Sequence, residues 1–153
     1  MTATAPANPT RLRPLRVADL PSVMLIEEEL FAPDNWTEAM LRDELSRTGT
    51  RVYLAAEVKG EVAGYGGFVD YGDEGHIATL GVRKTFQCKG IGALLLDALL
   101  AEADRRVDRV LLEVRADSPV PQLLYRSRGF AEIGRRLNYY PLSGADAVVM
   151  ARG

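Results

Sequence analysis

Residues 80–93, LGVRKTFQCKGIGA, constrain the fold more than any other stretch of the chain. An apolar run ends in a short polar segment, and Gly90 and Gly92 then open a leucine-rich segment, so the stretch predicts a strand, a loop and a helix N-terminus. The start of a helix leaves about four backbone N–H groups without intrahelical partners and carries roughly half a positive charge. The stretch therefore predicts a site for a phosphorylated ligand at the beginning of this helix.

The two glycines leave two interpretations open, because Gly-x-Gly pairs also allow a helix to pack closely on a strand. Each glycine lowers the stability of a helix by about 1 kcal/mol relative to Ala. Selection for helix stability alone therefore does not explain glycine at these two positions. The stretch is not a Walker loop, since no Lys followed by Ser or Thr comes after the second glycine. It also lacks the third glycine of a dinucleotide fingerprint. Cys88, inside the loop, is most simply a small filler.

The composition favours one soluble domain. A chain of 153 residues can bury about two thirds of its unfolded surface, and 19 Lys and Arg nearly balance 21 Asp and Glu, which argues against nucleic acid or an anionic membrane as the main partner. One cysteine and one histidine exclude an internal disulfide and a Cys- or His-rich metal site. No apolar run has the length of a membrane span, and MTATAPANPT does not resemble a signal peptide. We expect a disordered tail over residues 1–10, one domain over 11–153 and a cytoplasmic protein.

Hydrophobic periodicity predicts seven strands and four helices. Asp19 and Thr37 are expected to cap the first two helices, with Leu25 on the buried side of the first. Helical connections after two of the strands imply right-handed crossovers, so we expect an α/β fold with a mixed, mostly antiparallel sheet. The expected strands are 11–16, 51–58, 62–71, 76–82, 109–115, 130–139 and 145–151, and the expected helices are 20–31, 38–46, 90–106 and 119–128.

A lone carboxylate, Glu113, lies inside the apolar run VLLEV. Burial raises the pKa of a carboxyl group toward the range in which it serves as a general base near neutral pH. The alternative is an ion pair with Arg109 or Arg115, two residues away on the same strand face, and strand chemistry alone leaves both open. Tyr125, in the following helix, either anchors that helix or donates a proton, since a phenol has a pKa of about 10.

Several other side chains have both a structural and a functional interpretation. Phe31 and Trp36 flank the break between the first two helices, where they either pack into the junction or form the wall of a substrate pocket. Tyr139 and Tyr140 belong to a basic and aromatic group near the last strands, which is either a solvated face or a substrate wall. The acidic triplet 27–29 is expected to be a solvated helix face, with attraction of a basic peptide as the alternative.

Two segments, LGVRKTFQCKGIGALLL and LLEVRADSPVPQLLYRSRGFAEIGRRLNYYP, together resemble the GNAT acetyltransferases, and among them the RimI-type ribosomal-protein-alanine N-acetyltransferases. The resemblance covers about residues 12–150. QxxGxG indicates only the superfamily, whereas LEVR, LY, GF, GRR and NYYP point to the branch that acetylates N-terminal amines. The resemblance implies a seven-stranded mixed sheet flanked by helices. Its central parallel strands splay apart and hold the pantetheine of acetyl-CoA in the gap.

The resemblance also implies roles for individual residues. Glu113 matches the proton acceptor and Tyr125 the proton donor of a direct transfer that needs no nucleophilic residue and no metal. Ser118 stands where the family usually has Asn, so one cofactor contact is shorter or lost. Cys88 stands where Arg is common, so Lys89 would contact the phosphate instead. The expected cofactor-binding residues are Leu80, Gly81, Val82, Cys88, Lys89, Gly90, Ile91, Gly92, Ala93 and Ser118, and the expected substrate-binding residues are Phe31, Trp36, Tyr139 and Tyr140.

The resemblance thus implies an acetyl-CoA-dependent acetyltransferase of protein N-termini, with alanine favoured and a ribosomal protein as the target. From the charge balance and hydropathy we expect neither nucleic acid nor a membrane as a partner. One alternative is acetylation of a lysine side chain or a small amine, because the glycine loop does not specify the acceptor. The other is a non-catalytic acyl-CoA sensor, against which the presence of both Glu113 and Tyr125 speaks.

Overall fold

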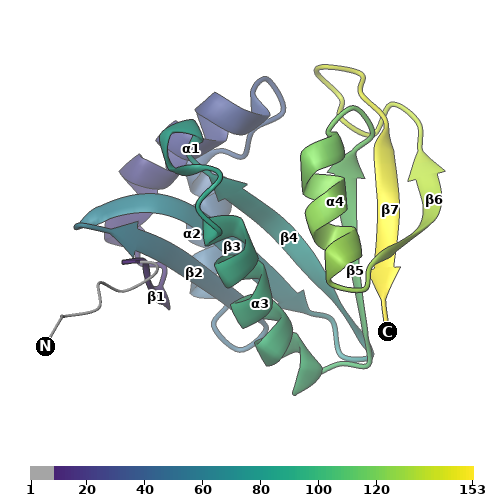
Figure 1. The fold of residues 1–153 in the computed structure, drawn as a ribbon, viewed down its shortest axis with the longest axis horizontal. Coiled ribbons are helices and arrows are strands. Elements are labelled where there is room, and N and C mark those ends of the chain that lie inside the picture. Colours follow the sequence, from purple (N-terminus) through teal and green to yellow (C-terminus); the bar gives the residue numbers. More distant parts are fainter. Residues whose placement is uncertain (1–8) are drawn as a thin grey trace, which may run out of the picture.

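A seven-stranded sheet of order β1-β2-β3-β4-β5-β7-β6 runs through the computed structural model, which describes residues 9–153 (Figure 1). Neighbouring strands are antiparallel except for the parallel pair β4 and β5, so the expected mixed, mostly antiparallel sheet is confirmed. The tail expected over residues 1–10 lies, up to residue 8, outside the described residues. The strands are β1 (Arg11–Pro14), β2 (Arg51–Val58), β3 (Glu61–Asp70), β4 (Glu74–Val82), β5 (Arg109–Arg115), β6 (Ala131–Arg136) and β7 (Ala147–Arg152).

Helices cover both faces of this sheet (Figure 1). One face packs against α1 (Leu20–Phe31) and α2 (Glu38–Ser46), and the other packs against α3 (Ile91–Asp104) and α4 (Pro119–Ser127). Two short 3₁₀ turns, η1 (Val17–Asp19) and η2 (Lys84–Phe86), precede α1 and α3. Within residues 9–153 no helix has the length and apolar character needed to cross a membrane.

The two central strands diverge after a short paired segment. Residues 74–76 of β4 pair with residues 109–111 of β5, although β4 continues to Val82 and β5 to Arg115. Beyond the paired segment, the edge of β4 that faces β5 has no strand partner. The expected splay of the parallel pair is therefore confirmed, and it opens one end of the sheet between the two halves of the molecule (Figure 1).

Asp19 is the N-cap residue of α1, as expected, but its side chain makes no capping hydrogen bond to the helix. It is the last residue of η1 and has helical backbone angles, whereas a capping residue is normally extended. Its carboxylate accepts hydrogen bonds from the Arg16 N–H at 2.8 Å and from the Arg13 guanidinium at 2.8 and 2.9 Å. The same guanidinium donates to Glu57 at 2.9 Å, so the cluster ties β1 and η1 to β2.

The buried side of α1 also differs from the expected one. Leu20, Val23, Ile26 and Glu27 are buried, whereas Leu25 is 53% exposed because it points to the opposite side of the helix. The expected cap of α2 is confirmed, since Thr37 Oγ1 accepts a hydrogen bond from the backbone N–H three residues later at 3.2 Å. The buried side of α1 therefore includes an acidic residue, Glu27, and does not include Leu25.

Replacement of Asp19 by Asn should lower the free energy of unfolding by about 2 kcal/mol at pH 7, because the nearly buried Arg13 loses its carboxylate partner. The hydrogen bond from Arg13 holds the pKa of Asp19 below its usual value. The stabilisation is thus present above about pH 4, the unfolded value, and is lost as the pH falls through the lowered pKa. Denaturant titrations should show a difference between variant and wild type that shrinks in acid.

Asp43→Asn is the matched control, because it breaks an exposed pair with Arg47 and should change stability by less than about 0.5 kcal/mol. An Asp19→Asn effect as small as that of the control would contradict a structural role for the cluster.

Candidate active site

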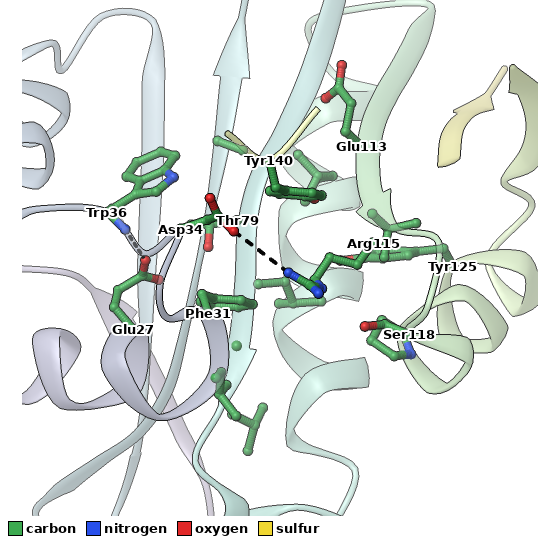
Figure 2. Close-up of a pocket in the computed structure, with 18 of the residues that line it drawn as sticks. Glu27, Phe31, Asp34, Trp36, Thr79, Glu113, Arg115, Ser118, Tyr125 and Tyr140 are labelled. Atoms are coloured by element: carbon green, nitrogen blue, oxygen red, sulfur yellow. Dashed lines mark hydrogen bonds and ion pairs between the residues drawn. The ribbon is translucent and has the colours of Figure 1, made fainter. Parts of the chain in front are cut away.

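A cavity of about 300 Å³ opens where β4 and β5 diverge. Its walls come from α1 and the loop after it, from β4 and β5, and from α4 (Figure 2). A second cavity of about 380 Å³ adjoins it and shares part of its lining. Of the residues expected to be catalytic or to bind cofactor or substrate, those that line the first cavity are Phe31, Trp36, Leu80, Gly81, Val82, Glu113, Ser118, Tyr125 and Tyr140.

Glu113 lies where the two cavities meet. Odd-numbered residues of β5 face away from the core beneath α3 and α4, so the carboxylate points into the gap and is 18% exposed. Its oxygens lie 3.7 Å from Arg136 Nη1 and 4.0 Å from His76 Nδ1. The charged group that faces Glu113 thus comes from β6, and not from Arg109 or Arg115 on its own strand. Nothing local in the sequence pairs Arg136 with Glu113, because the two residues lie on different strands, β6 and β5.

Tyr125 is buried on α4 and packs edge to face on Phe130, with ring centroids 5.8 Å apart. Burial raises the pKa of its phenol well above the usual value, so the hydroxyl keeps its proton at neutral and moderately alkaline pH. A further buried residue, Gln122, holds the helix in place, because its amide donates to the carbonyls of Arg115 and Ala116 at 3.0 and 3.3 Å. The Gln122 contact was not anticipated from the sequence.

The glycine loop lies between the end of β4 and the start of α3. Gly90 is the N-cap with φ of +79°, and a Cβ there would meet no atom within 4 Å, so the backbone conformation is what requires glycine. Gly92 has its nearest neighbour at ordinary contact distance, 3.6 Å from Leu124, so tight packing does not explain it. Gln87 ties the loop to β4 by donating to the Val82 carbonyl at 2.9 Å. The cavity reaches this loop only at Gln87, and the expected residues Cys88, Lys89, Gly90, Ile91, Gly92 and Ala93 lie beyond its lining.

Tyr139 and Tyr140 pack edge to face with ring centroids 5.1 Å apart and divide between the cavities. Tyr140 lines the first cavity, under the Arg115 guanidinium at 5.5 Å, and burial raises the pKa of its phenol to about 12. Tyr139 lines the second cavity, with Arg136 at 5.3 Å from its ring. Each tyrosine therefore lines a cavity, and a role in binding substrate stays a prediction for both.

Asp34 joins the α1–α2 loop (residues 32–37) to the β6–β7 loop (residues 137–146). Its carboxylate accepts hydrogen bonds from the N–H groups of Leu142 and Ser143 at 2.8 and 3.3 Å, and Arg115 Nη1 lies 3.8 Å away (Figure 2). The hydrogen bonds from Ser143 lower the pKa of Asp34. The partners lie more than 100 positions apart in the chain, so no local sequence signal indicates the contact.

Glu27 is buried, contrary to the expected solvated face, with 1% of its surface exposed. Position 27 lies one turn after Val23 on the buried side of α1, whereas Glu28 on the next position is exposed. The carboxylate accepts from the Trp36 N–H at 2.7 Å and from the Tyr65 hydroxyl at 2.5 Å. Trp36 accordingly packs against the α1 core and also lines the cavity, and its contact with a substrate stays a prediction.

The sequence profile of the acetyltransferase (GNAT) family matches residues 20–130, and the chain belongs to this family. The chain is 38% identical to the N-alpha-acetyltransferase RimI of Mycobacterium tuberculosis over 97% of its own length and 96% of that relative. It is 34% identical to the [ribosomal protein bS18]-alanine N-acetyltransferase of Escherichia coli, over 90% and 93% of the two chains.

The fold agrees with these sequence relationships. The crystal structure of the ribosomal-protein-S18-alanine N-acetyltransferase from Escherichia coli matches with a TM-score of 0.83 and 30% identity, over 94% of this chain and 92% of that one. The resemblance to RimI-type GNAT enzymes that the sequence motifs indicated is thereby confirmed.

Replacement of Asp34 by Ala should free the part of the β6–β7 loop around Leu142 and Ser143, because the amides of these two residues lose a charged acceptor. We expect hydrogen exchange at these two amides, followed by NMR, to accelerate about tenfold or more. The Asn138 N–H donates to Asp146 at 2.9 Å in the same loop and should keep its rate, which makes it an internal control. Unchanged exchange at Leu142 would contradict the link between the loops.

Proposed function

We propose that the protein is a cytoplasmic, acetyl-CoA-dependent N-alpha-acetyltransferase that modifies the N-terminal alanine of a ribosomal protein. The Escherichia coli relative, which is named for the alanine of ribosomal protein bS18, supports this acceptor, and this chain covers more than nine tenths of that relative. The observation that carries the proposal is that Glu113 and Tyr125 line one cavity at the gap between β4 and β5. A carboxylate and a protonated phenol at one cavity can serve as the base and the acid of an acyl transfer.

The donor would lie in the gap between the strands. Beyond residue 76, the edge of β4 that faces β5 has no strand partner, and this edge suits the amide groups of an extended pantetheine. The start of α3 offers N–H groups and a positive dipole to a pyrophosphate, and the conformation of Gly90 turns the chain into that helix. We therefore assign residues 80–82 to the pantetheine and acetyl group, residues 88–93 to the pyrophosphate, and Ser118 to a further contact.

The acceptor chemistry follows from the acidity of its amine. An N-terminal ammonium has a pKa of about 7.7 to 8, so much of the acceptor is protonated at neutral pH and only the free amine attacks. Glu113 takes up the excess proton, directly or through water. The amine nitrogen then bonds to the thioester carbon, the bond from that carbon to sulfur breaks, and the nitrogen releases its second proton to water, from which Tyr125 is protonated again. Backbone N–H groups of β4 can stabilise the oxyanion, and Tyr125 gives its proton to the departing thiolate.

A panel of acceptors tests the proposed function. Wild-type protein, acetyl-CoA and peptides that begin with Ala, Ser or Met are incubated beside lysine and polyamine acceptors, and products are read by mass spectrometry. We expect acetylation at the N-terminal amine, with kcat/KM for the Ala peptide at least about tenfold above that for lysine or polyamine. Transfer mainly to lysine or polyamine would replace the proposed acceptor. Acetyl-CoA binding without transfer would indicate a sensor.

The two catalytic assignments predict that Glu113→Gln and Tyr125→Phe each lower kcat by about a hundredfold or more. Both substitutions preserve shape, so the KM for acetyl-CoA should change by less than about twofold in steady-state kinetics. Glu132→Gln, at an exposed position on β6, is the control and should retain wild-type kcat. Wild-type turnover in either catalytic variant would remove that residue from the mechanism.

A further inference from the structure

Glu27 is a buried carboxylate beside the cavity, and the proposed transfer gives it no role. Withdrawal of a carboxylate from water is costly, and burial raises its pKa. Its two hydrogen-bond partners, the Trp36 N–H and the Tyr65 hydroxyl, are both neutral. A hydrophobic side chain of similar volume would fill the same space without that cost, so packing alone does not explain an acid at this position.

The hydrogen bond to Trp36 fixes the α1–α2 loop at its backbone. Figure 2 shows the Glu27 carboxylate below the Trp36 N–H, with the bond drawn between them. The Tyr65 hydroxyl, bound to the other carboxylate oxygen, in turn accepts a hydrogen bond from Thr79 Oγ1 at 3.4 Å. Glu27 therefore connects the loop to α1, to β3 and to the part of β4 that borders the gap.

Trp36 lies between the two cavities and lines both, as Glu113 does. The first cavity extends to Gln87 and Ser118, toward the loop that we assign to the donor. The second extends to Tyr139 and α2, away from that loop. An acceptor that meets the donor at Glu113 would accordingly enter from the second cavity, past the indole of Trp36.

We propose that Glu27 is a positioning residue for the acceptor: by holding the Trp36 N–H, it places the indole beside the entry to Glu113 and so determines how well the acceptor binds. This inference rests on the proposed acetyltransferase function. It extends that function by naming a residue that acts on acceptor affinity through Trp36, without touching the reacting atoms.

Two substitutions of equal size test the assignment. Glu27→Met and Glu27→Gln both preserve the side-chain volume, but only Gln keeps an oxygen that can accept from the Trp36 N–H. We expect Glu27→Met to raise the KM for an Ala-starting peptide about tenfold or more while the KM for acetyl-CoA changes by less than about twofold. Glu27→Gln should recover part of the loss. Glu28→Gln, its exposed neighbour, should match the wild type.

Fluorescence provides a second measurement that does not depend on turnover. Trp36 is the only tryptophan in the chain, so its emission reports on the α1–α2 loop. In Glu27→Met we expect emission at longer wavelength and stronger quenching by acrylamide, because the released indole is more exposed to water. Circular dichroism of each variant verifies that it is folded.

The outcomes separate the two proposals. A folded Glu27→Met variant with wild-type acceptor KM, or with both KM values raised alike and unchanged Trp36 emission, overturns the assignment of Glu27. Wild-type protein that acetylates no N-terminal peptide instead overturns the proposed function, and the acceptor role of Glu27 with it. That failure is distinguishable because it appears before any substitution is made.

Discussion

Three residue pairs join β4 to β5, and the position of every functional group depends on where this pairing stops. The strands can separate because the core beneath them stays continuous. Phe68 and Ile77 from one half of the sheet belong to the same buried cluster as Leu112 from the other half, and Leu96 and Leu99 of α3 belong to it as well. The hydrophobic contacts across the gap thus replace the missing ladder of hydrogen bonds, and they leave the opposite face open as a cavity.

The walls of that cavity combine strands and loops, and carboxylates fix the loops. Glu27 holds the α1–α2 loop from inside the protein, and Asp34 ties the same loop to the β6–β7 loop. Because Glu27 and Asp34 both hold the α1–α2 loop, folding already orders it. The loop therefore loses little further conformational entropy when a ligand binds. The side chains on these loops, Trp36 and Tyr140, are in this way nearly as well placed as those on the strands.

The spacing of apolar residues along the chain made most helices and strands predictable. The features that could not be predicted depend on contacts between residues far apart in the sequence. The predicted helix 20–31 and strands 51–58 and 109–115 coincide with those observed, since their apolar spacing is a property of adjacent residues. Glu113 and Tyr125 could be singled out for the same reason, as polar groups within apolar elements. Glu27 and Asp34 could not, because their partners lie at positions 65 and 142 and only the folded chain brings them together.

The unpaired edge of β4 also bears on how such a protein avoids aggregation. Free strand edges attract strands from other chains, and folded proteins usually blunt them with short, charged or proline-containing strands. The outer strands here have these features, because β1 reads RLRP and β6 reads AEIGRR. The free edge of β4 lies inside the molecule instead, facing β5. The fold therefore keeps a strand edge available to a ligand of extended shape while shielding it from other protein chains.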